Sequence, residues 1–432
     1  MVLKTARWTS VLLLFLALPG AGQSPLQWPV PPAGPPRKTV FPKILIGPAE
    51  LSRLLKTGAV SLDAREPGPY AEGHLPGALS AREGLPGAGT VALYGEGDDC
   101  EEIARLYWLL RRAGRAEAEV RILDGGIAAW RSARLPLETG TSHPRPASGP
   151  SPSPGLQTTV DKDWVAESFG QEGVELLDVR DARGWERWET PPTFAAGHIP
   201  YALPFDPRAL LPARGWPEPA EVRRRLATFG PRPGDPVRLE STFVLYAGDA
   251  DDPRLGLGYL LLTLAGLDAR VFPGGWKEWK AGASRPVVRV ISAAELAGRL
   301  RRGGPGLSLD HPRRDLILID LREASDFAIG HLPGALSLPF IHFPADFEKT
   351  VAAGWHGADP ALTPLVLYCY GIDCVRSRKA GALAAHKGFR DLLWFRGGVA
   401  EWRNAGYPLF DSPLPTRSSP AGSSHGRGGA RP

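Results

Sequence analysis

The sequence predicts an α/β protein of three tandem domains, each with a parallel sheet covered by helices on both faces. One pattern occurs three times along the chain, and in each copy short apolar segments alternate with helix-like segments. The length of 432 residues also exceeds what a single ordinary core needs. We expect the three domains at residues 43–139, 159–285 and 286–411.

The repeat is clearest in a Gly-His-Ile/Leu-Pro-x-Ala motif. Its copies begin at Gly73, Gly197 and Gly330. An apolar segment ending in Asp-x-Arg precedes each copy, with the aspartates at Asp63, Asp178 and Asp320. The spacing from this aspartate to the glycine is 10 residues in the first and third copies and 19 in the second. The additional residues, around 184–192, predict a surface insertion in the second domain.

A second apolar segment and a glycine pair complete each copy. The segment ends in a tyrosine, at Tyr94, Tyr246 and Tyr368. After a loop and a helix-like stretch, each copy has Gly-Gly and then a tryptophan four residues after the second glycine, at Trp130, Trp279 and Trp402. This arrangement predicts a strand, a tight glycine turn and a helix whose first turn buries the indole.

Each copy also opens with the start of a helix. Pro48 suits a first helical position, and Ser292 with Glu295 forms a capping box. Short apolar strands that alternate with helices pair in parallel and are joined by right-handed crossovers. Each copy therefore predicts a separate α/β domain.

The connecting segments differ in composition from the domains. Residues 23–42 are rich in proline and residues 140–158 in Pro, Ser and Gly, so both are predicted linkers. Domains two and three meet near residues 282–289 with little spacer, which predicts a closely packed pair. Residues 412–432 have no core-forming residues and are predicted to be a disordered tail.

The first 22 residues predict a signal peptide. Lys4 and Arg7 precede the apolar run Val11–Leu18, and small residues before Gln23 suit cleavage after Gly22. The run is too short to span a bilayer, so we expect no stable membrane insertion and a secreted or periplasmic protein. An uncleaved interfacial anchor is the alternative.

Composition and charge narrow the class of partner. Hydrophobic residues make up 43% and charged residues 22%, as in globular proteins. The formal charge of +5 falls to +3 without Lys4 and Arg7. This positive excess is too small to indicate nucleic-acid binding. It is compatible with a small anionic substrate or with a surface that is only solvated. Three cysteines are too few for a disulfide scaffold, and we expect no metal or cofactor.

The candidate site follows the apolar segment Leu365–Tyr368. Cys369 comes next, and a short loop then leads to Arg376 and a helix-like stretch. At the end of a buried strand and the start of a helix, backbone N–H groups and the helix dipole favour an anion, such as a thiolate or a persulfide. The alternative is that Cys369 is only a small buried hydrophobic residue.

The combination of these motifs resembles the rhodanese (sulfurtransferase) family over roughly residues 43 to 410. The resemblance implies a doubly wound α/β domain and a persulfide on Cys369 as the reaction intermediate. It implies catalytic roles for Cys369, Arg376 and Cys374. It implies substrate contacts from the loop residues Tyr370, Gly371, Ile372, Asp373, Val375 and Ser377. Arg376, Arg378 and Lys379 would attract an anionic donor, whereas the acidic loops of the other copies would repel it.

The first two copies lack the thiol, because Gly95 and Ala247 stand where Cys369 stands in the third. By analogy we assign them a scaffold role. In the family, Asp320 and Arg322 would pair to fix the loop, and His331 would hold a turn.

The third copy also departs from the family pattern. An arginine usually stands five residues after the cysteine, where this chain has Cys374, and Arg376 comes seven residues after Cys369. Related phosphatases carry Cys-x5-Arg, so a phosphate-cradling site is a weaker alternative. A periplasmic subgroup linked to quinoprotein alcohol oxidation has two close cysteines followed by Trp, where this chain has Val375.

The second cysteine of the loop leaves two interpretations open. Cys374 could resolve a persulfide or sulfenate on Cys369 through an intraloop disulfide, or it could be inert. Cys100 matches it in the first domain, as a relic or as a partner for another protein's thiol.

We expect an exported sulfurtransferase that moves sulfane sulfur from thiosulfate or a persulfide, a small anionic donor, to a thiol or protein acceptor. The alternative is a non-catalytic redox-sensing or partner-binding module that uses the pair Cys369 and Cys374.

Overall fold

The computed structural model describes residues 42–140 apart from 88, 98 and 99, and then 158–180, 192–228, 238–281, 285–302, 316–343, 345–347, 349 and 359–411. The expected signal peptide, the tail and nearly all of both linkers lie outside these residues, as does most of the insertion of the second domain. Within the described ranges, no helix combines the length and the apolar character needed to cross a membrane.

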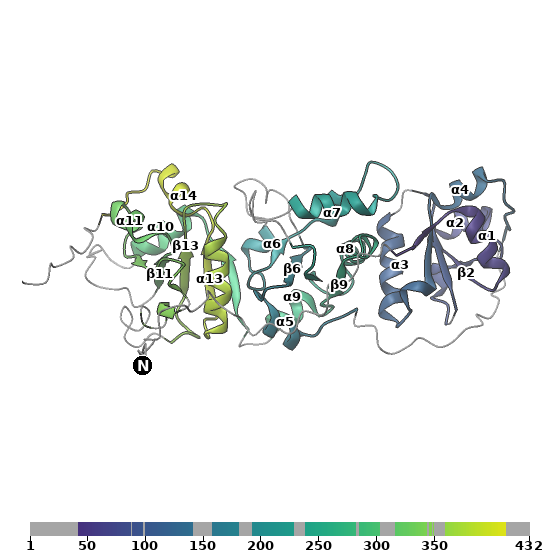
Figure 1. Ribbon diagram of the computed structural model, residues 1–432. Coiled ribbons are helices and arrows are strands. Elements are labelled where there is room, and N and C mark those ends of the chain that lie inside the picture. Colours follow the sequence, from purple (N-terminus) through teal and green to yellow (C-terminus); the bar gives the residue numbers. More distant parts are fainter. Residues whose placement is uncertain are drawn as a thin grey trace, which may run out of the picture.

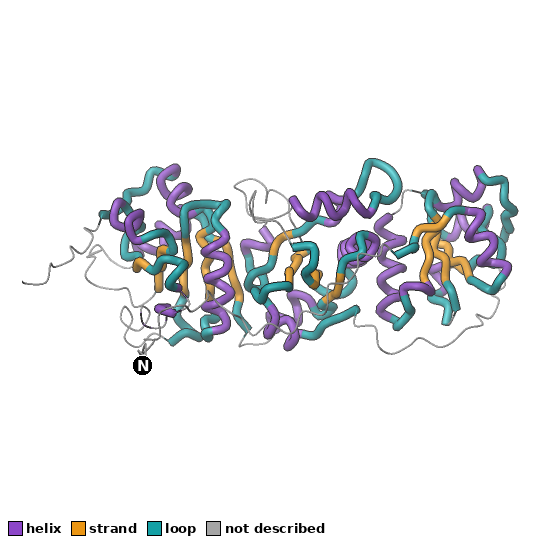
Figure 2. The backbone as a smooth tube through the Cα atoms, in the orientation of Figure 1, coloured by secondary structure: helices purple, strands orange, loops and turns teal. Residues whose placement is uncertain are grey.

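The three domains lie in a row, each with a parallel sheet between helices (Figures 1 and 2). The first contains β1 (Leu45–Ile46), α1 (Pro48–Lys56), β2 (Val60–Asp63), α2 (Pro67–Glu72), β3 (Leu79–Ser80), β4 (Val91–Tyr94), α3 (Cys100–Arg112), β5 (Val120–Leu123) and α4 (Gly126–Ser132), with 3-10 turns at Ala81–Glu83 and Glu117–Glu119. The second contains α5 (Lys162–Ser168), β6 (Val174–Asp178), α6 (Pro192–Ala195), β7 (Leu203–Pro204), a 3-10 turn at Pro207–Leu210, α7 (Pro219–Thr228), β8 (Thr242–Tyr246), α8 (Pro253–Leu264), β9 (Asp268–Val271) and α9 (Gly275–Ala281). The third contains β10 (Val287–Val290), α10 (Ala293–Arg302), β11 (Ile317–Asp320), α11 (Ala324–Ile329), β12 (Leu336–Ser337), β13 (Leu365–Tyr368), α13 (Val375–His386), β14 (Asp391–Phe395) and α14 (Gly398–Asn404).

The sheets share one topology, which confirms the predicted fold class. Their strand orders are β1-β5-β4-β2-β3, β7-β6-β8-β9 and β10-β14-β13-β11-β12. In the second domain a single parallel bridge from Thr159 to Val271 takes the place of the first edge strand. Apart from the half-buried Thr242 at the start of β8, the central strand is buried in each domain because helices cover both faces of the sheet.

The register of the third sheet brings three chain segments to one edge. Tyr368 of β13 pairs with Asp320 of β11 on one side and with Phe395 of β14 on the other. All three strands are parallel and end at this level, so the residues that follow them meet at the carboxyl edge of the sheet. Cys369 and Arg396 are two of these residues.

The Asp-x-Arg motif fixes the same loop in every domain. In the third, Arg322 donates to both carboxylate oxygens of Asp320 and to the carbonyl of Gly330, all within 3.1 Å. The ring of His331 stacks on Phe327, and its Nδ1 lies 2.9 Å from that residue's carbonyl. This geometry agrees with structural roles for Asp320, Arg322 and His331.

Helix α8 joins the first domain to the second. Every residue from Leu255 to Leu264 is buried, because α3 of the first domain covers the side of α8 that faces away from its own sheet (Figure 1). Gly256 permits the close approach, since a Cβ there would lie 2.8 Å from the carbonyl oxygen of Ala104. Tyr259 packs on Trp108 with ring centroids 5.0 Å apart.

Helix α13 makes the corresponding contact between the third domain and the second. The guanidinium of Arg378 donates to the carbonyl of Tyr201 and lies 3.8 Å from the centroid of its ring. Further along the helix, His386 stacks on Phe169 with centroids 4.2 Å apart. The helix that begins beside the candidate site is therefore held by side chains of both domains.

Candidate active site

Cys369 lies at the carboxyl end of β13, where the sequence predicts it. Its side chain is buried, and its carbonyl accepts the N–H of Val399 at 3.1 Å. Gly398, the second glycine of the Gly-Gly turn, passes directly against it. A Cβ on Gly398 would lie 2.2 Å from the Cys369 carbonyl oxygen, and its φ of +54° favours glycine as well.

The preceding tyrosine anchors the strand that carries Cys369. The hydroxyl of Tyr368 accepts the N–H of Leu332 at 3.2 Å. Burial is the main reason why the pKa of Tyr368 lies well above its ordinary value, with the charge of Asp320 adding to it. Tyr368 is therefore a neutral phenol that links β13 to the Gly-His-Leu-Pro turn.

Cys369 and Cys374 form a disulfide, with Cα atoms 6.3 Å apart. Cys374 is also buried and is the N-cap residue of α13. Its backbone N–H donates to the carbonyl of Gly371 at 3.0 Å. The loop thus closes on itself through one covalent bond and one hydrogen bond. Cys374 is thus the residue to which Cys369 is bonded in this structure.

Arg376 lies at the rim of the loop, on the first turn of α13. Its Nη1 donates to the carboxylate of Glu323 at 2.9 Å, and both side chains are partly exposed. Its guanidinium also lies 5.9 Å from the ring centroid of Tyr370. An exposed pair of this kind contributes only about 0–1 kcal/mol, so an anionic ligand can replace Glu323 as the partner of Arg376.

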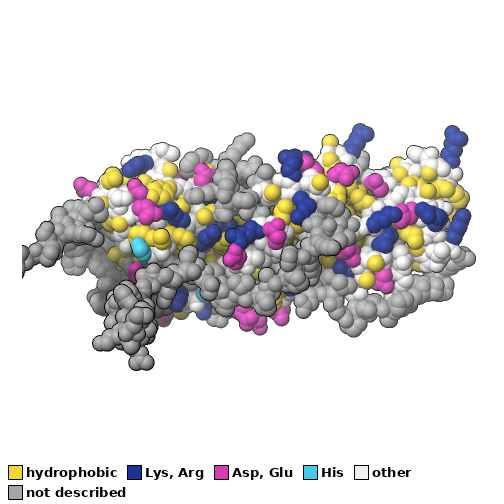
Figure 3. Space-filling model, in the orientation of Figure 1, with side chains coloured by type: hydrophobic (Ala, Val, Ile, Leu, Met, Phe, Trp, Pro, Cys, Tyr) yellow, Lys and Arg dark blue, Asp and Glu magenta, His cyan; other side chains and the backbone are white. Residues whose placement is uncertain are grey.

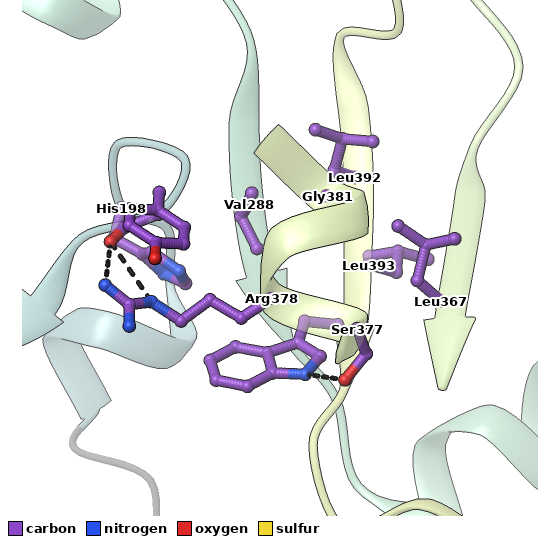
Figure 4. A pocket seen from close by; sticks show the side chains of 10 residues that line it. His198, Val288, Leu367, Ser377, Arg378, Gly381, Leu392 and Leu393 are labelled. Atoms are coloured by element: carbon purple, nitrogen blue, oxygen red, sulfur yellow. Dashed lines mark hydrogen bonds between the residues drawn. The ribbon is translucent and has the colours of Figure 1, made fainter. Parts of the chain in front are cut away.

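The predicted substrate-contacting residues occupy different depths. Tyr370 is exposed, and its hydroxyl donates to the carboxylate of Asp326. Gly371, Ile372 and Val375 are half-buried, and Asp373 is exposed. Ser377 is buried and points to the domain interior, where its Oγ accepts the indole N–H of Trp394 at 2.9 Å (Figure 4).

Arg378, which was expected to attract an anionic donor, lies in the contact between the second and third domains. Its side chain is 5% exposed and is bound to Tyr201, with the carboxylate of Glu175 3.8 Å away. The guanidinium therefore binds the second domain and does not face the rim of the loop. Of the two arginines, only Arg376 is placed at the rim.

Arg396 is a second cation at the site, which the sequence analysis missed. It follows β14 directly, is buried, and interacts with the charges of Asp373 and Glu401. Burial lowers the pKa of Arg396 to about 10, against the raising effect of those two carboxylates. The sequence did contain a signal, because the other copies have Asp124 and Pro273 at this position.

In the first two domains, the Gly-Gly turn packs against the residue that takes the place of Cys369. A Cβ on Gly126 would lie 2.4 Å from the carbonyl of Gly95, and one on Gly275 would lie 2.5 Å from that of Ala247. The Gly-Gly turn therefore packs against the loop in all three domains. The third domain differs in having a cysteine at this position.

Cys100 begins α3 and is buried, with its Sγ 3.6 Å from the carbonyl of Gly215 in the second domain. It forms no disulfide. Pairing with the thiol of another protein does not suit a side chain in this position.

A small cavity of about 10 Å³ lies behind the loop, between the second and third domains (Figure 4). It is lined by His198, Tyr201, Val288, Ser377, Arg378 and Trp394, among others. This volume is about that of one water molecule, too little for a sulfur donor. The described residues contain no cluster of three or more side chains that could hold a metal ion.

The charged residues around the three domains are mixed in sign. Figure 3 shows basic and acidic side chains interspersed over the described part of the face that it draws. The local charge at the rim, where Arg376 meets Glu323, follows the same pattern.

The chain is thus a repeat protein of three parallel α/β domains, one of which has a dicysteine loop at the carboxyl edge of its sheet. The family model described as rhodanese-like domain matches residues 47–133, 161–282 and 305–405. The chain belongs to this family.

Two relatives illustrate the likeness. A putative thiosulfate sulfurtransferase, SseB, from Mycobacterium tuberculosis is 31% identical over 286 residues, which are 57% of this chain and 97% of the relative. A probable 3-mercaptopyruvate sulfurtransferase from Pseudomonas aeruginosa is 32% identical over 208 residues, which are 48% of this chain and 69% of the relative. Among solved structures, SseA from Escherichia coli is 22% identical with a TM-score of 0.41, covering 54% of this chain and 99% of that chain.

Proposed function

We propose that this chain transfers sulfane sulfur through a persulfide on Cys369. The wider class, a sulfurtransferase-like enzyme, is supported by the family and by relatives named as thiosulfate and 3-mercaptopyruvate sulfurtransferases. The observation that carries the proposal is the position of Cys369 at the end of β13 and beside the start of α13, in the one domain whose loop begins with a thiol.

The first half-reaction requires the reduced loop. With the disulfide opened, the Cys369 thiolate attacks the outer sulfur of thiosulfate, a sulfur–sulfur bond forms, and sulfite leaves with the electron pair of the bond that breaks. Arg376 exchanges Glu323 for the sulfonate end of the donor and holds it by a charge-assisted hydrogen bond. A thiophilic acceptor then removes the outer sulfur of the persulfide.

Mass spectrometry tests this step directly. Reduced Cys374→Ser protein is freed of reductant and mixed with thiosulfate, and the peptide that contains Cys369 is expected to gain the mass of one sulfur atom. In the same background, Cys369→Ser abolishes the gain, because an alkoxide is not accessible near neutral pH. Cys100→Ser in that background is the matched control and retains it. If neither this protein nor the wild type gains sulfur or releases sulfite, the proposal fails.

We also propose that the protein is exported, on the basis of Lys4, Arg7 and the apolar run that follows them. Protein isolated from the periplasmic or secreted fraction is then expected to begin at Gln23. A mature protein that retains residues 1–22 would contradict the signal peptide.

A second candidate function is a redox-sensing or partner-binding module without turnover, which the bond between Cys369 and Cys374 favours. Its test is the number of free thiols in protein taken from its native compartment, followed by titration of the pair against a redox buffer. Thiols that never pair, even under a mild oxidant, rule this candidate out.

A further inference from the structure

We propose that Cys374 resolves the persulfide on Cys369 internally, so that the sulfane sulfur leaves as hydrogen sulfide and a dithiol then reduces the loop disulfide. This inference rests on the proposed sulfurtransferase function and names the route by which sulfur departs. The chain would then act as a reductase of thiosulfate-type donors, driven by thiols.

The first argument is the position of the attacking sulfur. The disulfide joins Cys374 Sγ directly to Cys369 Sγ, so the loop allows the two sulfurs to meet. In a persulfide this same Cys369 Sγ is the inner sulfur. Once a donor has left its sulfur there, the nearest nucleophile is the thiolate of Cys374, and its line of attack leads to the inner atom.

The second argument is burial. Cys369 is 1% exposed and Cys374 is 3% exposed. A folded protein has little access to sulfur at this depth, whereas small molecules such as thiosulfate, a small dithiol and hydrogen sulfide can enter or leave. An internal nucleophile removes the need for a large acceptor to enter the loop.

The third argument is electrostatic. Cys374 is the N-cap residue of α13, a helix of 12 residues, so developing negative charge on its sulfur meets the positive end of the helix dipole. The buried guanidinium of Arg396 lies near the other side of the loop, where it interacts with Asp373. Both features stabilise anions along the path from thiolate to departing hydrosulfide.

The chemistry balances in two steps. In the first, the Cys369 thiolate takes the outer sulfur of thiosulfate and releases sulfite. In the second, the Cys374 thiolate attacks the inner sulfur of the persulfide, the disulfide forms, and the outer sulfur leaves as hydrosulfide with the electron pair of the broken bond. Two thiol groups of an external dithiol then reduce the disulfide and become a disulfide themselves.

A single-turnover experiment separates this route from transfer to an external acceptor. Full-length protein is reduced with dithiothreitol, freed of it, and mixed with thiosulfate, and sulfite, sulfide and free thiols are measured. We expect stoichiometric sulfite and sulfide together with loss of both loop thiols. Cys374→Ser is expected to release sulfite but no sulfide and to keep the added sulfur on Cys369, while Cys100→Ser behaves as the wild type.

Each outcome has a defined meaning. If the wild type releases sulfite but retains the sulfur on Cys369 and gives no sulfide, internal resolution is wrong and the sulfurtransferase function stands. If neither sulfite nor a sulfur adduct forms in any variant, the proposed function itself fails. Cys374→Ala, checked by circular dichroism, repeats the test should the serine variant not fold.

Discussion

Replacing Arg378 by methionine tests whether the second domain holds the helix that starts at the active loop. The guanidinium donates to the Tyr201 carbonyl over 3.2 and 2.5 Å, and its side chain is 5% exposed. Methionine keeps much of the apolar stem and removes only the charged head. The variant therefore isolates the polar contact between the domains.

The expected loss follows from the contacts that Arg378 makes. Hydrogen bonds to a charged group contribute about 1.5–3 kcal/mol, and a desolvated cation–π contact adds about 0.5–2 kcal/mol. Loss of Arg378 also leaves the carboxylate of Glu175, 3.8 Å away, without this cation. Both contacts involve the same guanidinium and are therefore not fully additive, so we expect the opening free energy of α13 to fall by about 2–4 kcal/mol.

Hydrogen exchange of the peptide that covers α13 measures this opening. A loss of that size accelerates exchange roughly 30-fold to 1000-fold, since about 1.4 kcal/mol corresponds to a factor of ten. Arg376→Met is the matched control, because it removes the same group from the same helix at an exposed position and should cost no more than about 1 kcal/mol. Equal exchange in the two variants would refute the assignment of Arg378 to the domain contact.

Tyr201 gives a second test from the other side of the contact. Its φ of +69° is in the left-handed region, at the position where the other domains have Gly77 and Gly334 with φ of +65° and +72°. Tyr201→Gly relieves a backbone strain of about 1–2 kcal/mol and loses a cation–π contact worth about as much. Its free energy of unfolding should therefore stay within about 1 kcal/mol of the wild-type value. Tyr201→Ala loses the contact and keeps the strain, and should be the less stable of the two by urea denaturation. The opposite order would show that the left-handed backbone at this position is not strained, since both variants lack the ring.

Three further predictions concern acid, packing and donor binding. Burial lowers the pKa of His198 to about 3. Below about pH 6.5, His198 is therefore protonated in the unfolded chain but stays neutral in the folded domain. The free energy of unfolding should therefore fall by about 1.4 kcal/mol per pH unit below that pH, and urea denaturation of His198→Gln should lack this contribution. Gly398→Ala should lower the free energy of unfolding by about 3 kcal/mol, because the added Cβ would meet a backbone oxygen. Gly77→Ala, which lies in open space at a similar φ, should lower it by only about 1 kcal/mol. Equal urea midpoints for the two variants would contradict the packing argument. Arg376→Ala should raise KM for thiosulfate about tenfold with little change in kcat. Glu323→Gln should lower KM, since it frees the Arg376 guanidinium to bind the donor. An unchanged KM in both variants would show that Arg376 does not bind the donor.

Much of the fold could be predicted because the determinants are local. The Gly-Gly turn with its tryptophan and the apolar strands each encode a short piece of structure, and the threefold repetition made chance matches improbable. The position of Cys369 at a strand end followed from the same local pattern. Such features depend on neighbours within a few residues along the chain.

The parts that could not be predicted depend on contacts between distant segments. Arg376 and Arg378 look alike in the sequence, two residues apart at the start of one helix. Which of them is exposed depends on where the second domain packs, and the domain contact buries Arg378. The approach of Arg396 to the loop likewise depends on the register of β14 beside β13.

Comparison of the three copies with one another would have found these residues. All copies of a repeated unit keep the residues that its backbone needs. A residue that differs in one copy therefore indicates a requirement other than the fold, such as a contact with another domain or a role in the site. Tyr201 replaces a glycine that suits the left-handed backbone of its turn, and it carries the contact to Arg378. Arg396 stands where the other copies have an aspartate and a proline, in the one copy with a cysteine directly after its central strand. Departures from the repeat therefore mark the domain contact and the active loop, while agreement among the copies marks the fold.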